Sequence, residues 1–68
     1  MKLNLNYDNV KNDGQYHTMW KNGLVEICGY VGEFGNISLN VFVSGIPYLA
    51  TYSYRDVCEF VENHFNQP

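Results

Sequence analysis

The chain has 68 residues, the size of one small domain, which excludes a multidomain enzyme, so we expect a single domain over 1–68. Apolar residues make up 46% of the chain and charged residues only 16%, a balance too apolar for a disordered tail. The net charge is −3, and the four Lys and Arg residues are too few for the basic cluster that a phosphate backbone requires. Charge therefore argues against a nucleic-acid partner.

The first residues of the chain and the length of its apolar runs indicate where in the cell the protein is expected. Residues 1–6 alternate apolar and polar side chains, whereas a signal peptide has a continuous apolar core. No run approaches the roughly 18 apolar residues of a membrane-spanning helix. We therefore expect a cytoplasmic protein with no membrane partner, in which Cys28 and Cys58 are free thiols.

The N-terminal half predicts three strands. Residues 3–7 alternate apolar and polar side chains with a period of two, which predicts a first strand with one buried face. The Asn-Asp-Gly sequence within 9–14 predicts a turn. Two further apolar segments, over 15–21 and 24–31, predict the two strands of a β-hairpin.

The turn of this hairpin is predicted from Asn22-Gly23, the strongest short hairpin signal in the chain. Both central residues of a type I′ turn need a positive φ, and Asn and Gly adopt it most readily. A two-residue loop at this position fixes the register and pairs Trp20 with Val25. The same register places Gly29 beneath the ring of Tyr16 on the facing strand.

Two more strands and a helix complete the chain. A glycine-containing loop over 32–36 leads to a strand over 37–44, and a turn separates this strand from a last one over 48–52. Apolar residues at helical spacing predict a helix over 54–65, with Ser53 as its N-cap. The predicted fold is α+β, an antiparallel β-meander of four to five strands with one C-terminal helix packed on one face.

One helix covers only one face of such a sheet. The better apolar face carries Tyr16, Thr18, Trp20, Val25 and Ile27, so we place the helix there. The opposite face then displays Met19, Leu24, Tyr30, Phe42, Tyr48 and Tyr52. Exposed patches of Tyr, Phe and Met usually mark an interface. A second interpretation, in which sheet twist or the first strand folding over covers these side chains, remains open.

Four residues have the types that ligate zinc or that serve as a nucleophile and its base, namely His17, Cys28, Cys58 and His64. None of them forms the closely spaced ligand pair of a zinc module. His17 and Cys28 face each other in the predicted hairpin, but a thiol in the middle of a strand lacks the cleft and the lowered pKa of a catalytic cysteine. We therefore expect no metal, no cofactor and no catalysis.

The function that these observations favour is protein binding. The aromatic face self-associates as a homodimer or docks a host protein, and Glu33 and Phe34 in the loop supply specificity together with an acidic helix stripe of Asp56, Glu59 and Glu62. Nine Asn and six Tyr beside one Ala indicate an AT-rich genome, and analogy of size and composition suggests a phage or mobile-element inhibitor of a host enzyme or defence system. The alternative is a module that stacks a small ligand or single-stranded nucleic acid on its tyrosines.

Overall fold

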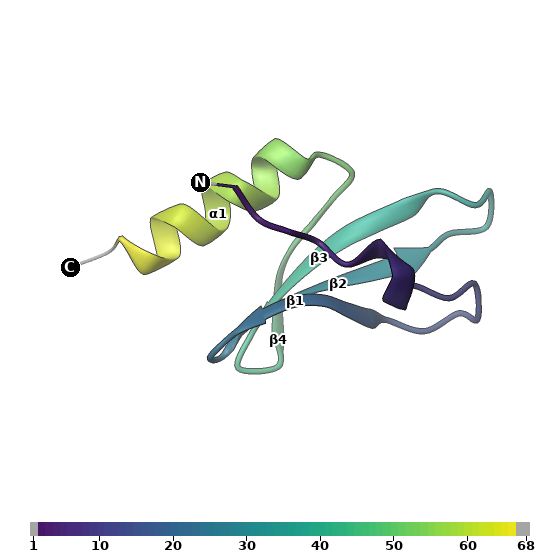
Figure 1. Ribbon diagram of the computed structural model, residues 1–68, viewed down its shortest axis with the longest axis horizontal. Coiled ribbons are helices and arrows are strands. Elements are labelled where there is room, and N and C mark those ends of the chain that lie inside the picture. The colour runs from purple at the N-terminus through teal and green to yellow at the C-terminus, as the bar shows by residue number, and fades with distance from the viewer. Residues whose placement is uncertain (1, 67–68) are drawn as a thin grey trace.

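A computed structural model describes residues 2–66 (Figure 1). Four antiparallel strands form one sheet in the order β1-β2-β3-β4, and a C-terminal helix follows them. The elements are a short 3₁₀ helix η1 (Tyr7–Asn9), β1 (His17–Asn22), β2 (Val25–Val31), β3 (Ile37–Val43), β4 (Ile46–Thr51) and α1 (Tyr54–Phe65). The predicted α+β meander with one C-terminal helix is confirmed.

The hydrophobic core lies between α1 and one face of the sheet. Its buried members are Leu3, Met19, Val25, Ile27, Leu39, Val41, Val57, Cys58 and Val61. The residues from β2 and β3 alternate along their strands, and on α1 the side chain of Val61 follows those of Val57 and Cys58 by four and three positions, as one buried face of each element requires. Ser53 accepts a hydrogen bond from the Asp56 backbone N–H (3.3 Å), so it is the N-cap that the sequence predicted.

The N-terminal segment crosses the core face beside α1, so the predicted strand over 3–7 is wrong. Residues 2–6 have no regular secondary structure, and η1 follows them. The Tyr54 hydroxyl accepts a hydrogen bond from the Leu3 N–H (2.7 Å) and donates one to the Leu3 carbonyl (2.8 Å). One side chain of the helix thus satisfies the two backbone groups that strand pairing would otherwise satisfy.

We expect Tyr54→Phe to loosen this segment, because two partly buried hydrogen bonds are lost together. Each such bond contributes about 1 kcal/mol, so the free energy of unfolding should fall by about 1–2 kcal/mol in chemical denaturation. The Leu3 amide should also exchange faster with solvent. Tyr52→Phe is the control, because the Tyr52 side chain is 71% exposed. Equal stability of the two variants would show that the Tyr54 hydroxyl does not hold the segment.

The turn between β1 and β2 lies one residue later than predicted. Asn22 is the last residue of β1, and Gly23 and Leu24 form the turn, with a φ of +62° at Gly23. A glycine with positive φ in the first central position is the pattern of a type II′ turn, which needs no left-handed second residue. Trp20 therefore pairs with Ile27, two residues beyond its predicted partner. The other strand bounds differ from the predicted ones by at most two residues.

Both edge strands carry a β-bulge, and each bulge overturns a prediction. The register of β1 shifts between Thr18 and Trp20, and Met19 lies in the core instead of on the opposite face. The register of β4 also shifts, and the ring of Tyr48, which was predicted on the face away from the helix, packs against Phe60 of α1 (6.1 Å between ring centroids), although Tyr48 also borders a groove on that opposite face. A bulge adds one residue to one strand, so the alternation of side chains changes at that point.

Candidate functional site

The sheet face opposite α1, called the open face here, carries the side chains that alternate with the core residues. Its members, read from the strand pairing, are Thr18, Lys21, Glu26, Cys28, Tyr30, Ser38, Asn40, Phe42, Pro47 and Ala50. The N-terminal segment contributes Leu3 to the same core as α1, so both of these elements lie on the other side of the sheet. Figure 1 shows α1 beside the sheet, with its C-terminal end extending beyond the strands.

Three aromatic rings gather on the open face and are called the ring cluster. The ring centroid of Tyr16 lies 5.1 Å from that of Tyr30 and 5.4 Å from that of Phe42, in tilted and edge-to-face arrangements. These separations lie within the favourable range for aromatic pairs. Tyr30 and Phe42 were predicted on this face, whereas Tyr16 was predicted on the core face. The bulge at Met19 reverses the alternation of side chains before it, and this places Tyr16 on the open face.

The ring of Tyr16 spans a pair of buried side chains. In the β2–β3 ladder, Cys28 lies opposite Asn40, one step along the same face from Tyr30 on one side and from Phe42 on the other. Because the ring of Tyr16 contacts both of those rings, it bridges the row of the ladder in which the pair lies. Cys28 is only 5% exposed and Asn40 only 7%, although neither belongs to the core cluster.

The buried pair is polar and is well satisfied by hydrogen bonds. Asn40 Nδ2 donates to the Cys28 carbonyl (3.3 Å), to the Ser38 carbonyl (3.3 Å) and to Ser38 Oγ (3.1 Å). Burial, and secondarily the charge of Glu26, raises the pKa of the Cys28 thiol to about 11. A reactive nucleophilic thiol needs the opposite shift. The pair is therefore suited to packing and hydrogen bonding beneath a ring.

A shallow groove of about 450 Å³ continues from the ring cluster toward β4. It is lined by Tyr16, Asn40, Phe42, Pro47, Tyr48, Leu49 and Ala50. Flat apolar walls with a single amide group are typical of sites that accept an apolar or aromatic group.

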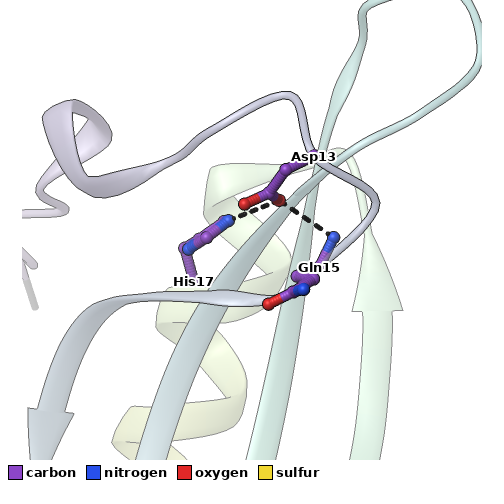
Figure 2. A network of polar contacts seen from close by, with 3 residues as sticks. All are labelled: Asp13, Gln15 and His17. Atoms are coloured by element: carbon purple, nitrogen blue, oxygen red, sulfur yellow. Dashed lines mark hydrogen bonds and ion pairs between the residues drawn. The ribbon is translucent and has the colours of Figure 1, made fainter.

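A carboxylate anchors the loop that carries Tyr16. Figure 2 shows Asp13 Oδ1 accepting hydrogen bonds from the Gln15 backbone N–H (3.1 Å) and from His17 Nε2 (2.7 Å). The hydrogen bond from His17 holds the pKa of Asp13 below its usual value. The resulting contribution to stability is present above the pKa of the carboxyl in the unfolded chain, and it is lost as the pH falls through the lowered pKa.

The other predicted interaction residues lie away from the ring cluster. Leu24 is exposed in the β1–β2 turn, and Tyr52 is exposed after β4. Glu33 and Phe34 lie in the loop between β2 and β3, where Phe34 is 87% exposed.

The acidic stripe lies on α1, which packs on the face opposite the ring cluster. Asp56 accepts a hydrogen bond from Thr51 Oγ1 (3.2 Å), Glu59 pairs with Arg55 (3.4 Å), and Glu62 is half-buried. The structure therefore does not bring the stripe together with the predicted aromatic face.

A second cleft, of about 370 Å³, lies between α1 and the end of the sheet and was not predicted. It is lined by Val43, Tyr48, Phe60, Asn63 and His64. The sequence feature that could have indicated this cleft is Phe60. It stands at the margin of the apolar stripe of the helix, so its ring lies at the side of the interface between helix and sheet.

The residues considered as zinc ligands do not form a site in the part of the chain that the structure describes. Residues 2–66 contain no group of three or more His, Cys, Asp or Glu side chains placed to hold a metal ion. Cys28 lies on the open face and Cys58 in the core, and both are free thiols. Within the same residues, no helix combines the length and the apolar character needed to span a membrane.

Comparison with known proteins gives no match to any family model, curated protein or solved structure.

Proposed function

We propose that this chain is a small protein-binding module without catalytic activity, and that it binds through the open face. The observation that carries the proposal is the ring cluster of Tyr16, Tyr30 and Phe42, which stands beside a groove on the face that α1 leaves open. Aromatic side chains are enriched at the centres of protein interfaces, because they bury a large area at a small cost in conformational entropy.

The edges of the sheet are protected, which favours a partner that docks on the open face over one that adds a strand to the sheet. At β1, the Met19 carbonyl accepts a hydrogen bond from the Asn6 N–H (2.9 Å), and the Thr18 carbonyl accepts one from Asn9 Nδ2 (3.0 Å). At β4, Pro47 lacks a backbone N–H, and both edge strands are bulged. Bulges, prolines and covering segments are the usual protection of sheet edges against strand pairing.

The open face by itself is small for a stable complex, whether the partner is a second copy of the chain or another protein. Four strands about 5 Å apart and about six residues long cover roughly 400 Å² of one face, half of the ~800 Å² that each partner buries in a standard stable complex. A partner that also reaches the exposed Phe34 in the loop after β2 would enlarge the contact.

The proposal extends, by analogy of size and composition, to a phage or mobile-element inhibitor of a host enzyme or defence system.

The charge of the open face favours a protein partner over single-stranded nucleic acid stacked on the rings. The open face carries one cation, Lys21, opposite one anion, Glu26. A face without a basic groove gives little attraction for phosphates. Binding through the ring cluster should therefore change little between 50 and 200 mM salt, whereas binding of a nucleic-acid backbone weakens steeply over that range.

The test is affinity capture from bacterial lysate, with and without nuclease treatment, with three forms of the chain compared at both salt concentrations. We expect a captured protein that is retained by Phe65→Ala, a matched control on α1, and reduced at least about tenfold by Phe42→Ala, as for a central aromatic contact. The ranking of the three forms by affinity should then be confirmed with the purified partner. Equal capture by the two variants, or capture that disappears with nuclease, would contradict the proposal. Concentration-dependent dimerisation that Phe42→Ala abolishes would assign the face to a second copy.

A further inference from the structure

We propose that Tyr16 is a movable lid over the Cys28–Asn40 pair, and that the Asp13 carboxylate holds this lid closed. The inference concerns the regulation of the open face. Its consequence for binding rests on the proposed function, whereas the lid itself rests on the contacts of Tyr16 alone.

The backbone of Tyr16 lies outside the paired ladder of the sheet. The first paired residue of β1 is His17, opposite Gly29, and residues 11–16 form an irregular segment before it. Tyr30 and Phe42, in contrast, lie within β2 and β3, the two central strands. Of the three rings in the cluster, Tyr16 is therefore the one whose backbone can move without breaking strand pairing.

The side chain of Tyr16 is more than half exposed, and it bridges the two rings that flank the buried pair. It also lines the groove together with Asn40. Movement of this ring would deepen the groove and open its floor to solvent, so that the Cys28 thiol and the Asn40 amide become accessible.

The contacts of Asp13 fix the residues on both sides of Tyr16. Its carboxylate accepts hydrogen bonds from the backbone of Gln15 and from the imidazole of His17, the two sequence neighbours of Tyr16 (Figure 2). With both neighbours held by one carboxylate, the direction of the Tyr16 side chain is held as well. Loss of the carboxylate should release the lid without removing any ring contact directly.

A partner that binds the groove therefore meets one of two surfaces. With the lid closed it meets the edge of the ring cluster, and with the lid open it meets a deeper slot with an amide at its floor. For a partner that requires the open form, the apparent Kd equals the Kd for the open form divided by the fraction of time that the lid is open.

The Cys28 thiol reports the position of the lid without any partner. The experiment measures the rate of alkylation of Cys28 and Cys58 by iodoacetamide at pH 8, resolved by peptide mass spectrometry in the same sample. Cys58 is 9% exposed and belongs to the core on the other side of the sheet, so its rate reports changes that are not confined to the open face. A complete return of the thiol pKa from about 11 to its ordinary value of 9.0 would raise the thiolate fraction roughly 100-fold at this pH, and this is an upper limit because Glu26 stays beside the thiol.

We expect Tyr16→Ala to raise the Cys28 rate by between tenfold and 100-fold, and Asp13→Ala to raise it by a smaller factor of about three or more, with Cys58 unchanged in both. The matched controls are Tyr52→Ala, an exposed tyrosine outside the cluster, and Glu33→Ala, an exposed acid in another loop. Neither control should change either rate.

Each outcome decides a part of the proposal. An unchanged Cys28 rate in Tyr16→Ala would show that the ring does not cover the thiol. A rise in Tyr16→Ala without one in Asp13→Ala would refute Asp13 as the group that holds the lid. If both thiols react faster in Tyr16→Ala, the ring is a structural element and the lid is refuted. None of these results depends on the protein partner, so the proposed function stands or falls separately on the capture experiment.

Discussion

Ile27→Ala is expected to lower the free energy of unfolding by about 3 kcal/mol, a large share of the total for a domain of this size. Ile27 is fully buried at the centre of β2, paired with Trp20 of β1 on one side and Val41 of β3 on the other. Truncation removes three carbon atoms and leaves a cavity in the core. Because the neighbouring strands hold each other in register, they cannot close in to fill it.

Urea denaturation followed by circular dichroism measures this effect. The control is Ile46→Ala, the same substitution at a position of β4 where the side chain is more than half exposed. Its cost should stay below about 1 kcal/mol, because much of the side chain is already in water. A loss of less than about 1 kcal/mol in Ile27→Ala would mean that the core face is not packed as described.

Gly29→Ala is expected to cost about 1–3 kcal/mol, although a glycine in a strand normally gains stability when it is replaced by alanine. A Cβ at this position would lie 2.7 Å from Cγ2 of Val10 and 3.0 Å from Sδ of Met19. The Met19 side chain can turn aside, whereas the stiff Val10 side chain can move only with its backbone. The methyl group should therefore push the N-terminal segment away from the sheet. This packing also corrects the prediction that Gly29 lies beneath an aromatic ring of the facing strand.

A double-mutant cycle with Val10→Ala isolates this contact. Removing Cγ2 of Val10 makes room for the new methyl group, so the double variant should be at least about 1 kcal/mol more stable than the sum of the two single effects predicts. Gly32→Ala is the control, because a Cβ there would meet only the Asn36 carbonyl, at an ordinary 3.5 Å. Strict additivity in the cycle would contradict the close approach of the N-terminal segment to β2.

The sequence by itself determined the elements whose signals are local. The helix over 54–65 has its own N-cap and a consistent apolar spacing, and its observed bounds match the prediction. The strands β2 and β3 alternate regularly because both lie inside the sheet, where each is paired on two sides. Regular alternation also placed Tyr30 and Phe42 on the open face, so two of the three rings of the candidate site were predictable.

Only the tertiary structure decided the features that depend on neighbouring segments. Residues 3–7 alternate like a strand, but the Tyr54 hydroxyl, 51 positions away, satisfies the backbone of Leu3 and holds the segment across the core. A glycine can take the positive φ of either central turn position, so Asn22-Gly23 alone did not fix where the hairpin turns.

The bulges of the two edge strands had the largest consequences for the candidate site. Each edge strand is paired on one side only, so it can accommodate an extra residue, and packing against the core selects where that residue lies. One bulge moved Met19 into the core and Tyr16 onto the open face, and the other accompanies the placement of Tyr48 beside α1. The excess of aromatic residues was visible in the sequence, whereas the face on which each ring stands depended on one added residue in each edge strand.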